Sequence, residues 1–327
     1  LPMKSLRYYL VFVLVFLPLT AWSKDYLYVT NETRDLLSII DGDMGLVVQE
    51  VPLGSGPCDV ILDRTGDIMA VSHQGKGGEL WLLNRKTLKV KHKVLLEEGK
   101  EKAECFYLAF SDDSRRLYAV NKFSGLLYVV DPVEGKIKKR IELGGEKPYL
   151  FTRPVLSPDG RRLYTVDGRH GRITVVDTVR GIVADTITAD GAIAVVLSPD
   201  GKTLYVVNGE NSSLDILDLE TKKRGKQIPL GNGTIDADIS PDGSLLFISN
   251  QHSYSVTVVD SKHQELAANI QVGTFPMGIK VSPDGKRAYV CNWIDGDVSI
   301  IDTAAKREIS RVLVKSTPLA IAVYHSP

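Results

Sequence analysis

The sequence lacks the motifs by which many enzymes and metal proteins are recognised. It holds three cysteines and six histidines in 327 residues, and no C-x-x-C-H segment that would attach a c-type haem. The serine motif G-x-S-x-G, the zinc motif H-E-x-x-H and a glycine-rich phosphate loop are missing as well. Two Asp-Gly-Asp segments, at 41–43 and 295–297, lack the spaced oxygen ligands and terminal Glu of a calcium loop, so we interpret them as turns. The sequence therefore predicts no metal site and no known catalytic set.

An excess of charge of either sign is also lacking. The 40 Lys and Arg residues balance the 40 Asp and Glu residues, so the formal net charge is zero. A nearly neutral chain has no field that would attract nucleic acid or an anionic membrane, so neither is an expected partner. No linker or low-complexity run divides residues 24–327, which we expect to form a single domain.

The one long apolar run lies near the start of the chain. A basic segment, 3–7, precedes the apolar residues 10–19, which are too few to span a bilayer comfortably. The tripeptide at 21–23, Ala-Trp-Ser, fits a small-x-small cleavage site, and no Cys follows it that would carry a lipid anchor. Residues 1–23 are thus predicted to be a signal peptide, with a retained anchor helix as the alternative. The mature protein is expected to be periplasmic or secreted, without a membrane span.

What the sequence does contain is a repeated turn. Ser-Pro-Asp-Gly occurs at 157–160, 198–201, 240–243 and 282–285, at intervals of 41 or 42 residues. Each copy is followed by a strand-like run that ends in Asn or Asp. A fixed period of this length, built from short strands and turns, indicates an all-β fold, the β-propeller, with one repeat per blade.

Weaker copies bring the number of predicted blades to seven. Residues 63–66 and 111–114 occupy the place of the turn in two earlier repeats. The first repeat begins at Tyr26 with the second strand of a blade, and its missing inner strand is matched by residues 318–323 at the other end of the chain. The prediction is a ring of four-stranded antiparallel blades in which the C-terminal strand closes the first blade and leaves no open sheet edge. The expected blade boundaries lie near residues 55, 101, 147, 190, 232 and 274.

A family resemblance follows from Tyr28-Val29-Thr30-Asn31, from Ser38-Ile39-Ile40-Asp41 and from the Ser-Pro-Asp-Gly turns. With these motifs the chain resembles the YVTN-repeat propellers of exported bacterial and archaeal proteins, over essentially all of residues 24–327. Those propellers in turn resemble the ones that bind haem d(1) in cytochrome nitrite reductases and in the machinery that makes this cofactor. The resemblance implies the fold and suggests haem d(1) or another tetrapyrrole as a cofactor. It leaves the function open, because propellers host many chemistries.

The repeat separates a regular face of the predicted disc from an irregular one. The Ser-Pro-Asp-Gly turns join strands one and two on the first face, and their Pro and Gly fit the dihedral angles of tight turns, so we interpret them as structural. The loops between strands two and three, and between blades, form the other face and vary, so a site is expected there. Inner strands begin on this face at equivalent positions, which are Asp59, Tyr107, Arg153, Ala194, Asp236, Gly278 and Ala320.

Three histidines on the irregular face, His73, His170 and His252, are candidate ligands of a metal or of a haem iron. The alternative is that they are ordinary loop residues, because they belong to three separate blades and are too far apart to share a small ion. His73 is the best candidate for a single axial ligand. It replaces the usual Asn of the repeat, and the glycine-rich segment 75–78 beside it leaves room for a bulky ligand.

Charged residues near the predicted axis have two interpretations. Arg153 with Asp59, Asp236 and Asp238 can form a structural ion-pair set that plugs the channel. Alternatively, cations on this face can hold the carboxylates of an anionic ligand. The candidate cations are Arg153, Lys280, Lys122 and Arg169.

Aromatic residues and cysteines complete the set of candidates. Aromatic rings can supply flat walls for a planar cofactor or can simply pack the blades. The rings in question are those of Tyr107, Phe123, Tyr254 and Trp293. Cys58 and Cys105 begin adjacent inner strands and can form a disulfide if their Cα atoms lie within about 7 Å. Cys291 falls within a strand and is expected to be buried.

We therefore predict an exported, non-enzymatic binding or scaffold protein, with a site for a small molecule or an exported protein on the face opposite the turns. Family resemblance leaves two alternatives. One is a periplasmic haem d(1) or tetrapyrrole protein or enzyme, with His73 as axial ligand and Arg153 and Lys280 at the propionates. The other is a lactonase-like hydrolase, whose acidic or metal-bound water centre would have to come from Asp59, Asp236 and Asp238.

Overall fold

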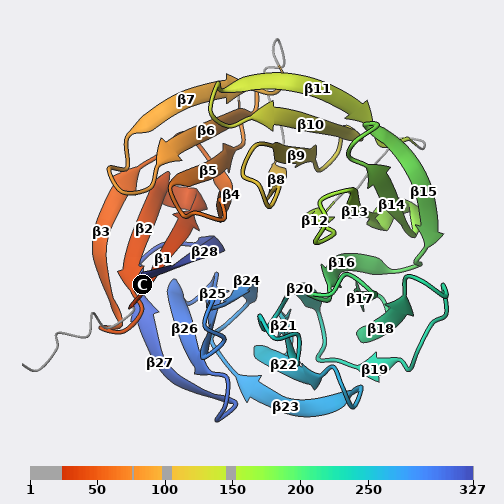
Figure 1. Ribbon diagram of the computed structural model, residues 1–327. Coiled ribbons are helices and arrows are strands. Elements are labelled where there is room, and N and C mark those ends of the chain that lie inside the picture. Colours follow the sequence, from red (N-terminus) through yellow and green to blue (C-terminus); the bar gives the residue numbers. More distant parts are fainter. Residues whose placement is uncertain (1–23, 76, 98–104, 145–151, 327) are drawn as a thin grey trace, which may run out of the picture.

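The computed structural model describes residues 24–75, 77–97, 105–144 and 152–326. In this part of the chain, 28 strands form seven four-stranded antiparallel sheets arranged in a ring (Figure 1). The predicted seven-bladed propeller is confirmed. The predicted signal peptide lies outside the described residues, and none of the helices described is long and apolar enough to cross a membrane.

Each blade runs from an inner strand beside the axis to an outer strand at the rim. From inside to outside, blade one consists of β28 (Pro318–Ser326), β1 (Lys24–Asn31), β2 (Leu36–Asp41) and β3 (Leu46–Pro52). Blade two consists of β4 (Pro57–Leu62), β5 (Ile68–His73), β6 (Glu79–Asn84) and β7 (Val90–Leu95). Blade three consists of β8 (Phe106–Phe110), β9 (Leu117–Asn121), β10 (Leu126–Asp131) and β11 (Lys136–Glu142). Blade four consists of β12 (Val155–Leu156), β13 (Arg162–Asp167), β14 (Arg172–Asp177) and β15 (Ile182–Thr188).

The remaining blades follow the same order. Blade five consists of β16 (Ala192–Leu197), β17 (Thr203–Asn208), β18 (Ser213–Asp218) and β19 (Ile228–Pro229). Blade six consists of β20 (Thr234–Ile239), β21 (Leu245–Asn250), β22 (Ser255–Asp260) and β23 (Glu265–Gln271). Blade seven consists of β24 (Pro276–Val281), β25 (Arg287–Asn292), β26 (Asp297–Asp302) and β27 (Arg307–Leu313). Two short 3-10 helices, η1 (Glu32–Arg34) and η2 (Gly168–His170), lie between strands two and three of blades one and four.

Blade one is completed by both ends of the chain, as the sequence predicts. β28 pairs antiparallel with β1, so that Asp25 lies opposite His325 and Tyr28 lies opposite Ala322. The pairing supplies the inner strand that the first repeat lacks. It closes the ring and covers the inner edge of β1.

The repeated turn has the structural role expected of it. In blade four, the Ser157 hydroxyl donates to Oδ1 of Asp159 at 2.6 Å, and this oxygen also accepts the amide of Arg161 at 3.0 Å. The amide of Gly160 donates to the carbonyl of Ser157 at 2.8 Å with a positive φ of 66°, a region that favours glycine. The next turn of the blade docks on this one, because the Thr178 hydroxyl donates to the carbonyl of Gly160 at 2.5 Å. Both turns therefore lie on one face of the disc.

The hydrophobic core lies between the blades. Between blades seven and one, for example, Leu27, Val29 and Ile40 pack with Tyr289 and Val298, and all five are fully buried. Alternate side chains of a strand point to opposite sides of its sheet, so each blade contributes to two such layers. Burying one large apolar side chain contributes about 1.5–3 kcal/mol, and layers of this kind recur around the ring.

Candidate functional site

Arg153 lies at the axis of the ring and ties three blades together. It precedes β12 in blade four, and its guanidinium contacts Asp59 of blade two at 2.7 Å and Asp236 of blade six at 3.5 Å. Asp59 is fully buried, and its other oxygen accepts the amide of Leu108 in blade three at 3.0 Å. Burial acts to lower the pKa of Arg153, but the two carboxylates outweigh it and raise the pKa above its usual range. The geometry supports the structural interpretation of these charges, an ion-pair set across the channel.

A second ion pair lies farther along the axis. Lys280 Nζ contacts Asp238 Oδ1 at 3.2 Å, and the other oxygen of Asp238 accepts the amide of Val281 at 2.9 Å. Lys280 lines a cavity of about 740 Å³ on the face of the turns, together with residues of the turns at 63–66 and 111–112. It does not line the cavity on the irregular face.

The irregular face has its own axial cavity, of about 260 Å³. Arg153 lines both axial cavities and lies between them. Six of the seven equivalent inner positions contribute to the cavity on the irregular face, the exception being the buried Asp59. The lining residues are Cys58, Cys105, Tyr107, Lys122, Thr152, Arg153, Gly168, Ala192, Ile193, Ala194, Ile235, Asp236, Met277, Gly278, Leu319 and Ala320.

The walls of this loop-face cavity are mostly apolar, with few polar groups. Arg153 and Asp236 contact each other, whereas Lys122 has no ion-pair partner in the described part of the chain. Two buried polar atoms beside the cavity, Thr152 Oγ1 and Arg153 Nε, likewise have no hydrogen-bond partner there. Apolar walls with a few polar groups are typical of sites for small molecules.

Two cysteines and a tyrosine contribute to the same cavity. Cys58 and Cys105 are free thiols in the structure, so the disulfide considered from the sequence is not formed. Burial and the neighbouring Cys58 thiol raise the pKa of Cys105 well above its usual range. Burial likewise raises the pKa of Tyr107. Cys105 and Tyr107 are therefore neutral at physiological pH and add no charge to the cavity.

His73, the sequence-based candidate for an axial ligand, does not line the cavity. It is almost fully buried, and its ring packs against Trp81 with the ring centroids 4.8 Å apart. Its Nε2 accepts the amide of Gly54 at 3.2 Å, and Nδ1 donates to the carbonyl of Glu79 at 3.3 Å. An axial role through Nε2 would require the loss of the contact with Gly54, and the ring is buried away from the cavity. His73 instead replaces the Asn of other blades, such as Asn31, whose side chain also bonds to the third strand of its blade.

The other rim candidates lie on separate blades, away from the cavity. His170 contacts Asp167 at 2.7 Å within blade four. His252 and Trp293 both pack against the ring of Phe275, at centroid distances of 6.2 and 5.8 Å. The structure thus brings Arg153 and Tyr107 together at the loop-face cavity, and it does not bring the three histidines together.

Sequence reasoning missed the apolar part of this cavity. Ile193, Ile235, Met277 and Leu319 directly precede four of the equivalent inner positions, and Thr152 precedes Arg153. Neighbouring side chains of a strand point to opposite faces of the sheet, yet at the start of these inner strands both line the cavity. The alignment of the repeats, which places these residues next to the equivalent positions, held the signal.

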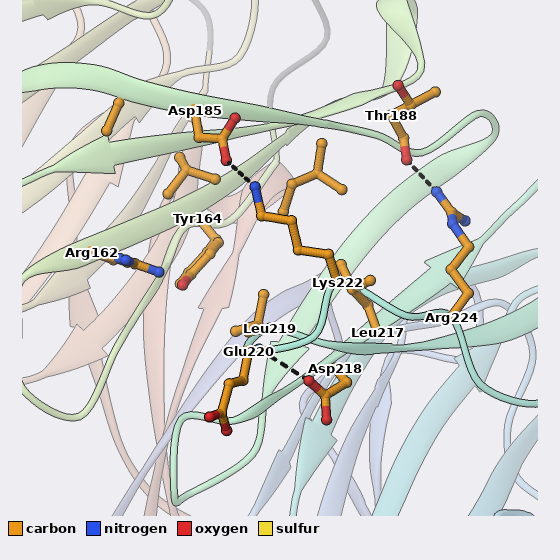
Figure 2. A pocket seen from close by; sticks show the side chains of 13 residues that line it. Arg162, Tyr164, Asp185, Thr188, Leu217, Asp218, Leu219, Glu220, Lys222 and Arg224 are labelled. Atoms are coloured by element: carbon orange, nitrogen blue, oxygen red, sulfur yellow. Dashed lines mark hydrogen bonds and ion pairs between the residues drawn. The ribbon is translucent and has the colours of Figure 1, made fainter.

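A further cleft, of about 680 Å³, lies at the rim between blades four and five (Figure 2). Here the outer strand of blade five, β19, has only two residues, while its neighbour β15 has seven. Lys222 reaches across to Asp185 at 3.2 Å, and Arg224 donates to the carbonyl of Thr188 (Figure 2). Lys222 is 76% and Asp185 49% exposed, so this larger cleft is edged by weak, solvated ion pairs. The loop-face cavity, with its buried groups, is the stronger candidate for a ligand site.

Comparisons with known proteins agree with the fold. The sequence matches a family of lactonases with a seven-bladed β-propeller over residues 161–274, about a third of the chain. No curated protein matches it. Among solved structures, hydrazine synthase from Kuenenia stuttgartiensis is 18% identical with a TM-score of 0.75, covering 85% of this chain and 92% of that one.

Two further structures bear on the expectations from the sequence. Dihydro-haem d1 dehydrogenase NirN, in complex with DHE, is 17% identical with a TM-score of 0.68, covering 90% of this chain and 74% of that one. A putative 6-phosphogluconolactonase from Bacteroides uniformis is 15% identical with a TM-score of 0.75, covering 92% and 99%. At these identities the likeness is one of fold, and a fold does not determine a function. The chain is a seven-bladed β-propeller that is similar in fold to the haem d1 enzyme NirN and in residues 161–274 to the lactonase propellers.

Proposed function

We propose that this protein is an exported, non-enzymatic binding protein that holds a small, largely apolar anion in the loop-face cavity. The observation that carries the proposal is the composition of that cavity: apolar walls, one closed end at Arg153, and the ammonium of Lys122. This ammonium has no carboxylate partner among the described residues and lies 5.2 Å from the centroid of the Phe123 ring. A carboxylate or phosphate at one end of the ligand would contact Lys122. The apolar remainder would replace water against Ile193, Ile235 and Leu319.

The size of the cavity limits the ligand. Its 260 Å³ lies just below the range of about 300–1,000 Å³ that is typical of sites for drug-sized ligands. The ligand we propose is therefore a small carboxylic or phosphoric acid with an apolar body. The acidic residues at the axis support binding over catalysis, because the carboxylates of Asp59, Asp236 and Asp238 are already held by cations and backbone amides.

The test uses octanoate and benzoate as first probes, followed by a panel of small carboxylates and phosphate esters. We expect saturable binding in titration calorimetry. Lys122→Gln should weaken it about tenfold or more, since a charge-assisted bond contributes about 1.5–3 kcal/mol. Ala194→Phe should fill the cavity and abolish binding, and the exposed Lys136→Gln is the matched control. The proposal would be refuted if Lys122→Gln and Ala194→Phe both bound the probes as tightly as the unaltered chain, or if no member of the panel bound at all.

A tetrapyrrole is the second candidate, favoured by the likeness to the complex of NirN and by the cations Lys122 and Arg153 near the axis. The loop-face cavity is too small to enclose the macrocycle, which would have to lie across its mouth. Titration with haemin, followed by the Soret band, tests this candidate. A shifted band that is lost in Lys122→Gln but kept in Lys136→Gln would support it and would overturn the proposal of a small anion.

A lactonase-like hydrolase is the third candidate, favoured by the family match over residues 161–274. Its test is turnover of 6-phosphogluconolactone and of simple chromogenic lactones, with and without a chelator. We expect no turnover above the rate without protein. Turnover by the purified protein that is lost on chelation would establish a hydrolase and would end the non-enzymatic proposal.

A further inference from the structure

The place where the ring closes holds a cluster of side chains that the proposed function does not use. Asp25 of β1 and His325 of β28 are direct partners in the closing strand pair, and Nδ1 of His325 contacts Oδ1 of Asp25 at 2.7 Å. Both lie on the face of the turns, at the opposite end of the inner strands from the loop-face cavity. The second oxygen of Asp25 accepts the hydroxyl of Tyr289 in blade seven at 2.5 Å.

A second carboxylate reaches the cluster from blade seven. Asp284 belongs to the Ser-Pro-Asp-Gly turn of that blade, and its Oδ1 is used within the turn, by the Ser282 hydroxyl at 2.6 Å and the amide of Lys286 at 3.0 Å. Its other oxygen, Oδ2, contacts the ammonium of the exposed Lys286 at 3.4 Å. Donor atoms of Asp25, Asp284 and His325 all lie within 4.8 Å of one another, the only group of three such residues found in the described part of the chain.

These three residues line a cavity. A cavity of about 150 Å³ is lined by Asp25, Asp43, Asp284, Lys286, Arg287 and His325. A cavity of this size admits an ion together with its remaining water ligands. The cluster and the cavity are separate observations, and both place the same three donors around one point.

The two cations in the lining leave the carboxylates largely uncompensated. Arg287 is paired with Asp43, a third carboxylate of the lining, at 2.7 Å, and it donates to the carbonyl of Gly42 at 2.9 Å. Lys286 is 79% exposed and contacts Asp284 at 3.4 Å, so it can move into solvent at little cost. Asp25, in contrast, is only 5% exposed. Two carboxylates therefore face one imidazole in a site that favours a cation.

The two carboxylates and the imidazole indicate which class of cation the site would bind. Calcium and magnesium prefer all-oxygen sites, whereas a site with imidazole and carboxylate ligands suits zinc and its neighbours in the transition series. We propose that Asp25, Asp284 and His325 form a binding site for a divalent transition metal, with zinc as the representative ion. The ion fastens the N-terminal and C-terminal strands of blade one to the turn of blade seven, with water completing its coordination.

The site has a structural consequence that follows from where its ligands come from. The ligands belong to three segments that are far apart in the sequence and meet only when the ring is closed. A metal bound here stabilises the closed ring, because the unfolded chain has no such site. The role needs no ligand in the loop-face cavity and does not depend on the proposed function.

Zinc binding is measured by titration calorimetry on the untagged, EDTA-treated full chain. We expect one zinc ion per chain and, at a concentration a hundred times the dissociation constant, a rise in the thermal midpoint of about 5 °C. Asp284→Asn and His325→Ala should each weaken zinc binding by more than about 100-fold, since loss of a partner that only orients a ligand already costs about 10–100-fold. The rise in the midpoint should vanish in both.

Asp200→Asn is the matched control. Asp200 occupies the same place in the turn of blade five and makes the same two turn contacts, at 2.6 and 3.0 Å. Asp284→Asn and Asp200→Asn each keep a side-chain oxygen that can accept the hydrogen bonds of the turn. Any general loss of stability from altering the turn therefore appears in both variants. The control should bind zinc like the unaltered chain.

Two results would overturn the proposal. One is zinc binding and stabilisation that survive in Asp284→Asn and His325→Ala, which would place the ion elsewhere, for example at the exposed pair of His263 and Asp260. The other is an unaltered chain that binds no zinc, or binds only calcium irrespective of His325.

Discussion

The buried imidazole of His73 should make the stability of this propeller depend on pH. Burial lowers the pKa of His73 from 6.5 to about 4, and the opposing effect of its bond to the carbonyl of Glu79 is smaller. In the unfolded chain the same group titrates near 6.5. Between these values the unfolded state binds a proton that the folded state does not, so the free energy of unfolding falls as the pH is lowered.

The size of the effect follows from the shift. Each pH unit between the two pKa values removes about 1.4 kcal/mol, so lowering the pH from 7 to 5 removes about 2 kcal/mol through this one residue. His73→Asn restores the residue that the other blades use most often at this position, such as Asn31 and Asn121. The variant has no titrating group there and should lose this part of the pH dependence.

The assay is urea-induced unfolding followed by circular dichroism at pH 7, 6 and 5, for the unaltered chain and for His73→Asn. The curves of unfolding free energy against pH should diverge toward low pH, with the unaltered chain losing more. His263→Asn is the matched control, because His263 is solvent-exposed beside Asp260 and its pKa is raised rather than lowered. If the unaltered chain and His73→Asn lose the same free energy between pH 7 and 5, the reasoning about a buried neutral imidazole is wrong.

Three further predictions test the scaffold. Arg153→Met should lower the free energy of unfolding by about 3–5 kcal/mol in urea titrations, because it leaves the buried carboxylate of Asp59 without its cation; a loss below 1 kcal/mol would contradict the ion-pair plug. Gly160→Ala should cost about 1–2 kcal/mol although nothing lies within 4 Å of the added methyl group, because φ is +66° there; an unchanged midpoint would show that the turn relaxes. A chain that ends at residue 317 lacks β28 and should lose its cooperative thermal transition, and a sharp transition would mean that three strands suffice for blade one.

The fold could be predicted from the sequence because the same pattern of turn and strands recurs along the chain. The turn at 157–160 and its copies fix where strands begin, and the period fixes the blades. Even the closure by β28 was visible, since Pro318 and the residues after it resemble the start of β24. The predicted blade boundaries near 55, 190, 232 and 274 fall between the outer strand of one blade and the inner strand of the next, and those near 101 and 147 lie outside the described residues.

The sites were harder to predict, because they depend on departures from the repeat. His73 was conspicuous as the residue that replaces Asn. Its hydrogen bonds to Gly54 and Glu79 nevertheless give it a structural role, because it bonds to the third strand of its blade as Asn31 does. The cluster of Asp25, Asp284 and His325 was invisible, since no spacing in the sequence relates a first strand, a last strand and a turn. Repeats report what the blades share, whereas cavities and clusters arise where neighbouring blades differ.

The closure of blade one also bears on how the protein is made. Asp25 and His325, which face each other in the finished ring, are 300 residues apart in the chain. A ribosome produces about 5–20 residues per second, so the first strand waits on the order of 15–60 seconds before its partner exists. During that time the inner edge of β1 is exposed to other chains. Synthesis order thus gives this propeller a period in which the inner edge of its first strand has no partner from its own chain.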